Sequence, residues 1–121
     1  MNDGLGLNTT QTWPIPRFGG KTRKAWLIID GSNVNHTILD QWPSGSFGAS
    51  GSGGYSTSLL IAAGLLPSKN GTIVRTTVCG DSFNCQAMVS LSSATAGTIE
   101  TYANSATPAS VGGPVYIEFW A

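Results

Sequence analysis

The sequence predicts an all-β protein: an antiparallel β-sandwich (jelly-roll-like or a small barrel) with an extended N-terminal arm. Short runs rich in β-branched and aromatic residues recur about every 8 to 15 residues, and clusters of Gly, Ser, Asn and Asp separate them. No segment shows the apolar period of a helix of ordinary length. The chain of 121 residues fits one domain. We therefore expect an arm at residues 1–20 and a sandwich domain at residues 21–121.

The arm is expected to be extended because of its prolines. Pro14 and Pro16 lack the N–H that a helix or a central strand requires. Trp13 and Ile15 give the same segment apolar side chains that would be unusual in a free tail. We expect these side chains to dock on a surface, either of the same subunit or of a neighbour.

The first half of the domain predicts a hairpin followed by a long loop. Residues 24–30 form an apolar strand, and the turn cluster that follows ends it. Residues 34–39 are expected to form a second, shorter strand that completes the hairpin. Residues 40–54 are rich in Gly and Ser and predict the longest loop of the chain, about 15 residues, which is typical of a functional segment.

The second half predicts strands of alternating or β-branched character. A turn at residues 80–85 is expected to join two of them as a second hairpin. The expected strands are residues 55–63, 71–79, 86–91, 97–102 and 113–120.

The last strand is apolar on both faces, which is unusual so close to a chain end. Val115, Ile117 and Phe119 alternate with Tyr116 and Trp120. One face can line the core of the domain, and the other needs a second sheet or a second subunit. The residues expected at an oligomer interface are Trp13, Ile15, Tyr116 and Trp120.

The composition favours assembly over nucleic-acid or membrane binding. Only 10% of the residues are charged, against roughly a quarter in an average soluble domain, and the net charge is zero. The basic cluster at residues 17–24 is short, so we interpret it as a solvated or interface-facing loop, with phosphate binding as the alternative. No apolar run reaches the roughly 20 residues of a membrane span, and no signal peptide is visible.

The residues that catalyse reactions are few, so we expect no enzyme. His36 is the only histidine, and no nucleophile elbow accompanies it. Glu100 and Glu118 lie on expected strands, where a structural ion pair with Arg23 or Arg75 is favoured. The Gly-rich stretch at 48–54 lacks the Gly-Lys-Ser/Thr close of a phosphate-binding loop. We expect no metal and no cofactor.

The two cysteines leave two alternatives open. Cys79 and Cys85 have no third ligand nearby for zinc. They can close a small loop as a disulfide in an oxidising environment, or remain as two buried thiols that flank a turn.

Three aromatic residues flank the long loop and form the candidate ligand site. Trp42, Phe47 and Tyr55 are surrounded by short polar side chains, a pattern typical of loops that hold saccharide or protein ligands. The alternative is that the three rings anchor the loop to the core.

The chain also resembles a family of small β domains in bacteriophage tail fibres and related virion proteins. Residues 24–31 (Lys-Ala-Trp-Leu-Ile-Ile-Asp-Gly) resemble its "Lys-Ala-Trp-Val-Asn-Phe-Asn-Gly" opening, and residues 54–57 resemble its "Gly-Asp-Tyr-Thr" strand. Residues 113–120 resemble its terminal "Asp-Pro-x-Tyr-Val-x-Val-x-x-Phe". The 40–54 segment and the two cysteines depart from the pattern. The resemblance implies a homotrimeric knob at a fibre tip, and it assigns no binding residues.

These observations together predict a bacteriophage virion structural protein, an oligomeric fibre or spike tip domain that mediates host-surface attachment. The expected partners are further copies of the chain, most simply in a trimer, other virion proteins, and a host-surface saccharide or protein. The expected location is the virion, after synthesis in the host cytoplasm. The alternatives are a capsid or tail decoration protein that stabilises the particle, and a carbohydrate-binding module. A small hydrolase is disfavoured.

Overall fold

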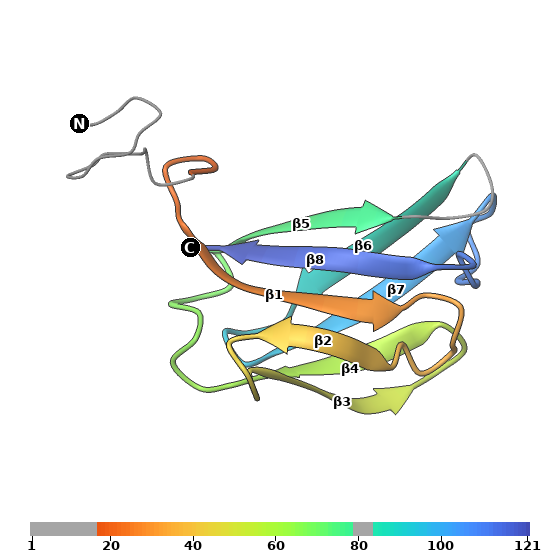
Figure 1. Cartoon of the computed structure of the whole chain (residues 1–121), viewed down its shortest axis with the longest axis horizontal. Helices are drawn as coiled ribbons and strands as arrows, with labels where there is room; N and C mark the ends of the chain where they lie inside the picture. Colours follow the sequence, from red (N-terminus) through yellow and green to blue (C-terminus); the bar gives the residue numbers. More distant parts are fainter. Residues whose placement is uncertain (1–16, 79–83) are drawn as a thin grey trace.

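The computed structural model describes residues 17–78 and 84–121, and these residues form eight strands and no helix (Figure 1). The all-β prediction is confirmed. The strands are β1 (Arg23–Asp30), β2 (Ile38–Trp42), β3 (Phe47–Ser52), β4 (Ser56–Ile61), β5 (Ile73–Val78), β6 (Cys85–Leu91), β7 (Ala96–Ala103) and β8 (Pro114–Trp120).

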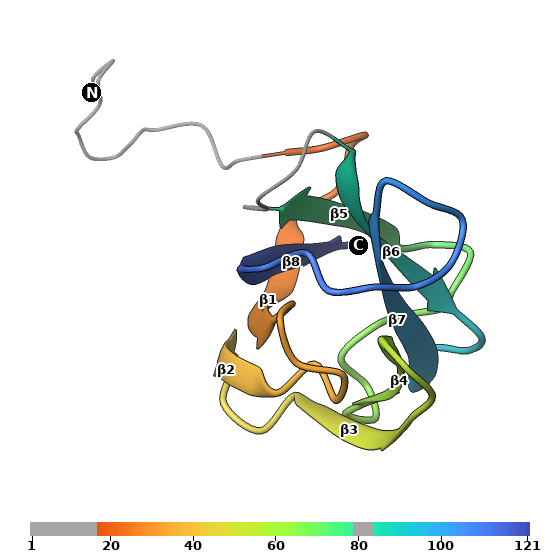
Figure 2. The same ribbon diagram turned by 90° about the vertical axis from the view of Figure 1, so that its right-hand side faces the viewer.

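The strands form two four-stranded antiparallel sheets packed face to face, which confirms the predicted sandwich. The front sheet has the order β2-β1-β8-β5, and the back sheet has the order β3-β4-β7-β6. Figure 2 shows the two layers, with β2 close to β3 on one side and β5 close to β6 on the other. Because the sheets are separate, the chain adopts the sandwich and not the barrel.

The core lies between the sheets and follows from strict alternation along the central strands. In β1 and β8, Leu27 pairs with Ile117, and both side chains are fully buried. Phe47 from β3 stacks on Phe119 from β8, with ring centroids 4.8 Å apart, and so joins the two sheets. The buried apolar cluster is Ala25, Leu27, Ile29, Phe47, Leu59, Ile61, Leu66, Ile99, Val111, Val115, Ile117 and Phe119.

The second strand lies later in the chain than predicted, although the hairpin itself is confirmed. β2 pairs with β1 over Ile38–Trp42, and residues 31–37 form a turn. The Asp30 carboxylate accepts the Ser32 N–H at 3.0 Å, and the Asn33 side chain accepts the Asn35 N–H at 2.8 Å. Such local bonds compete with strand pairing. The sequence pattern of apolar residues did not reveal them.

The long loop predicted at residues 40–54 is wrong, because most of it is strand. Its first residues belong to β2, and β3 pairs with β4 from Phe47, opposite Ile61, to Ser52, opposite Thr57. Gly and Ser have low strand propensity, but pairing with a neighbouring strand overrides it at this sheet edge. A bulge between Ala49 and Gly51 accommodates the irregular sequence.

The second predicted hairpin, across residues 71–91, is also wrong. β5 pairs with β8 in the front sheet, whereas β6 pairs with β7 in the back sheet. The connection between β5 and β6 therefore crosses from one sheet to the other. Cys79 lies outside the described residues, so the disulfide with Cys85 and the alternative of two thiols both stay predictions.

Replacing Phe119 with alanine should lower the free energy of unfolding by about 3–5 kcal/mol, because it removes a fully buried ring and its stacking partner. Met88→Ala is the matched control: this side chain is 46% exposed on β6 and should cost no more than about 0.5 kcal/mol. Urea unfolding of both variants measures the difference. Equal, small losses would show that the two sheets do not depend on this contact.

Candidate binding surface

The outer face of the front sheet gathers aromatic and charged side chains from all four strands. Strand register places Trp42, Trp26, Glu118 and Arg75 in one row across β2, β1, β8 and β5. The adjacent row is Asp40, Ile28, Tyr116 and Thr77. Alternation directs both rows outward, because the residues between them line the core.

Three of these residues form what we call the aromatic face: Trp42, Trp26 and Tyr116. Trp42 is 49% exposed on the edge strand β2, directly opposite the partly buried Trp26 on β1. The Trp26 and Tyr116 rings lie 6.1 Å apart, tilted by 45°. Large rings with fixed positions and open surface provide contact area at a low entropy cost, which suits ligand binding.

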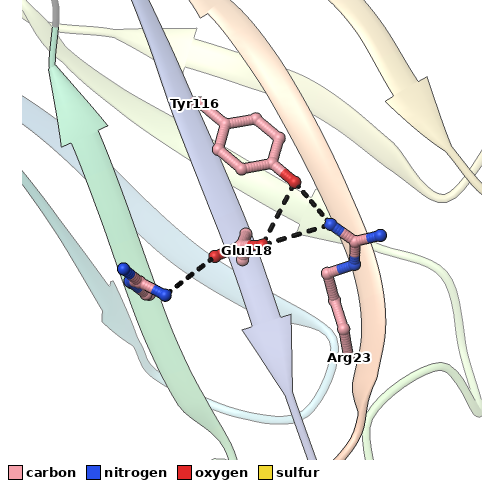
Figure 3. Close-up of polar contacts among 4 residues, drawn as sticks. Arg23, Tyr116 and Glu118 are labelled. Atoms are coloured by element: carbon pink, nitrogen blue, oxygen red, sulfur yellow. Dashed lines mark hydrogen bonds and ion pairs between the residues drawn. The ribbon is translucent and has the colours of Figure 1, made fainter. Parts of the chain in front are cut away.

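A polar cluster holds one side of the aromatic face in place (Figure 3). Arg23 Nη1 donates to the Tyr116 hydroxyl at 2.8 Å and to Glu118 Oε2 at 3.2 Å, and the hydroxyl donates to the same oxygen at 3.2 Å. Arg75 Nη1 lies 3.8 Å from Glu118 Oε1. Both arginines that the sequence offered as partners of Glu118 therefore contact it. Burial and the charge of Glu118 raise the pKa of Tyr116, so its hydroxyl remains a donor.

The outer face of the back sheet differs in chemistry. Its rows are made mainly of hydroxyl side chains, with Ser58, Thr98 and Ser90 adjacent across β4, β7 and β6. Glu100 accepts hydrogen bonds from Ser56 at 3.3 Å and from Tyr102 at 2.9 Å. This face carries no tryptophan, so the aromatic face distinguishes the front sheet.

The structure separates the three aromatic residues that the sequence grouped as a ligand site. Phe47 is a core residue, 7% exposed, so its assignment to a ligand site is wrong. Trp42 precedes β3 and Tyr55 follows it, so these two lie at opposite ends of that strand. The Tyr55 hydroxyl donates to the Ser32 carbonyl at 3.4 Å, and its ring lies 6.2 Å from that of His36. Only Trp42 is presented on the front sheet.

The residues expected at an oligomer interface have different surroundings. Trp120 is 6% exposed within the single chain, where the Phe18 ring packs edge-on at 5.9 Å. The Trp120 end of the outer side of β8 is therefore covered within one chain, whereas the sequence argument required a second sheet or a second subunit there. Tyr116 is partly buried in the polar cluster. Trp13 and Ile15 lie outside the described residues.

Sequence reasoning missed Trp26 as a surface residue. Its position was available from alternation, because Trp26 lies between Ala25 and Leu27, and both of these are buried. Its neighbours Trp42 and Tyr116 are distant in the sequence. The strand pairing that brings the three rings together could not be deduced from the residues around any one of them.

His36 is a buried structural residue. It lies in the 31–37 turn with φ of 47°, and its ring nitrogens contact Thr57 Oγ1 at 2.8 Å and Thr101 Oγ1 at 3.0 Å. It therefore links a front-sheet turn to two back-sheet strands. Desolvation lowers its pKa, and the nearby charge of Asp30 opposes this shift. With both nitrogens occupied and 1% of the residue exposed, His36 is not placed to act on a substrate.

Residues 17–78 and 84–121 contain no group of three or more His, Cys, Asp or Glu side chains arranged to hold a metal ion. In the same part of the chain, no helix long and apolar enough to span a membrane is present. A comparison with protein-family models, curated proteins and solved structures found no match.

Lowering the pH from 7.5 to 5.5 should reduce the free energy of unfolding. The pKa of His36 is depressed in the folded state, so below the unfolded value of 6.5 the unfolded chain binds the additional proton. The stability that depends on a neutral, buried His36 is fully present above that pH and is lost as the pH falls. Urea unfolding across this range measures the slope. His36→Asn, which tolerates positive φ and does not titrate, should flatten it; an unchanged slope would contradict the assignment.

Proposed function

We propose that this chain is a non-enzymatic attachment module of a bacteriophage virion, a fibre or spike tip domain that binds a host-surface saccharide. The observation that carries the proposal is the aromatic face. Trp42 offers half of its surface to solvent beside Trp26, and Tyr116 is fixed next to them by Arg23 and Glu118. Flat apolar rings bordered by oriented polar groups match the alternating apolar and hydroxyl surfaces of a sugar.

Self-assembly is the second part of the proposal, with a homotrimer as the expected form. A formal net charge of zero and only 10% charged residues favour association.

A monomeric carbohydrate-binding module is the second candidate, because the aromatic face supports it equally. It shares the ligand surface but needs no assembly. The oligomeric state therefore decides between the two, and ligand binding tests what they have in common.

Trp42→Ala should weaken saccharide binding by about tenfold or more, equivalent to about 1.4 kcal/mol, because it removes the most exposed ring of the aromatic face. A glycan array identifies the best ligand of the wild-type chain, and calorimetry then measures both affinities. Leu60→Ala is the matched control, since Leu60 has the same 49% exposure but lies on the back sheet. Equal affinities of Trp42→Ala and wild type would contradict the proposed site.

Light scattering of the full chain should give a mass of about three times 12.5 kDa, unchanged on dilution. Apolar association of this kind persists at low concentration when the interface is obligate. A concentration-independent monomer would contradict the trimer and favour the monomeric carbohydrate-binding module.

A further inference from the structure

All six Lys and Arg residues of the chain belong to segments that meet at one end of the sandwich, where β1 and β5 begin and β8 finishes (left in Figure 1). We call this surface the basic end. Its members are Arg17, Lys21, Arg23, Lys24, Lys69 and Arg75. We infer that the basic end binds an acidic polysaccharide. The saccharide class rests on the proposed function, whereas the negative charge of the ligand follows from the basic residues themselves.

Strand pairing brings these residues together from three parts of the chain. Thr22 and Ala121 exchange two backbone hydrogen bonds, which fixes the start of β1 beside the end of β8. Arg75 on β5 lies opposite Glu118 on β8, and its guanidinium lies 5.6 Å from the centre of the Phe18 ring. The 17–24 segment and β5 therefore form one surface.

A tight turn folds the first basic residue back onto the others. Phe18 and Lys21 exchange backbone hydrogen bonds of 3.0 and 3.1 Å. The two residues between them, Gly19 and Gly20, have φ of 61° and 77°, which glycine adopts without the cost that a side chain would add. Arg17, directly before Phe18, therefore lies close to the residues that lead from Lys21 into β1.

Little negative charge balances this surface. Among the described carboxylates, Glu118 alone lies within the basic end, and it already contacts Arg23 and Arg75. Asp40 lies on β2, two strands from β8, and Glu100 lies on the back sheet. Six basic side chains therefore lie at an end that holds one of the described carboxylate side chains, in a chain whose formal net charge is zero. Such an uncompensated field attracts anions.

The basic end also contains a hollow of about 340 Å³ between β5 and β6. Val74, Val89 and Leu91 line it from the two strands, and Lys69, Asn70 and Thr72 line it from the connection that precedes β5. The volume falls at the lower end of the range for small-molecule sites, roughly 300–1,000 Å³. The lining exposes mainly polar surface, and its ammonium, amide and hydroxyl suit a sugar unit that bears a carboxylate or sulfate.

A polysaccharide fits this surface better than a single-stranded nucleic acid does. Nucleic-acid channels use open aromatic faces on which the bases stack. At the basic end, Trp120 is buried against Phe18, and the Phe18 ring is in turn faced by Arg75. Phe18 is 40% exposed, but Arg75 lies over its ring, and the more exposed ring, Trp42, belongs to the adjoining aromatic face, which Arg23 links to the basic end through Tyr116.

The test measures binding of the full chain to polygalacturonate, dextran sulfate, uncharged dextran and a single-stranded oligonucleotide. The double substitution Lys24→Gln/Lys69→Gln removes two exposed charges that make no ion pair with Glu118, and so should leave the fold intact. The control Ser58→Glu/Ser90→Glu changes the net charge by the same two units, at exposed positions on the outer face of the back sheet. Circular dichroism verifies folding of both.

We expect at least one acidic polymer to bind while dextran does not. Its affinity should fall about tenfold between 50 and 200 mM salt, and at least fivefold further in the lysine variant, with a much smaller change in the control. Equal losses in both variants, or tighter binding of the oligonucleotide, would overturn the inference. Binding of uncharged dextran that Trp42→Ala abolishes and the lysine variant retains would overturn it too, yet leave the proposed function standing. Absence of binding to either acidic polymer would overturn it outright.

Discussion

The pairing of β8 between β1 and β5 is the constraint on which the rest of the structure depends. The last strand of the chain is a central strand of the front sheet, so that sheet is incomplete until residues 114–120 are in place. Val115, Ile117 and Phe119 are fully buried on its inner side, and Phe119 carries the stacking contact to the back sheet. One strand therefore orders its own sheet and joins it to the other.

The central position of β8 also buries a carboxylate, Glu118, on the outer side of the strand. Glu118 is only 8% exposed, and a carboxylate so buried is costly unless it is paired. Its partners come from both neighbouring strands, Arg23 at the start of β1 and Arg75 on β5. A shift of either strand by one residue would move its arginine to the opposite face and remove one of the two partners of the carboxylate. The ion pairs thus specify register, and through it the positions of Tyr116 and Trp26.

The strands that the sequence predicted correctly are those whose own residues show strand propensity or an alternating apolar pattern. The strands at β1, β5, β6, β7 and β8 have β-branched or alternating residues, and burial follows that alternation in β1, β6 and β7, whereas the last four residues of β8 are all buried. β3 escaped prediction because Gly-Ala-Ser-Gly-Ser acquires its strand conformation from pairing with β4. Phe47 was assigned to a binding loop for the same reason. Once its neighbours are recognised as strand, alternation places it in the core.

The candidate surfaces were harder still to predict from the sequence, because they arise from the pairing of distant strands and not from any single segment. The sequence showed a basic cluster at 17–24 that is short by itself, with Lys69 and Arg75 as scattered residues. Antiparallel pairing of β8 with both β1 and β5 makes the beginnings of those two strands neighbours, and the scattered charges become one surface. The same pairing leaves the described carboxylates elsewhere, apart from the one that the arginines enclose. A chain with no net charge can consequently present a strongly charged end, since composition fixes the sum of the charges and topology fixes where they lie.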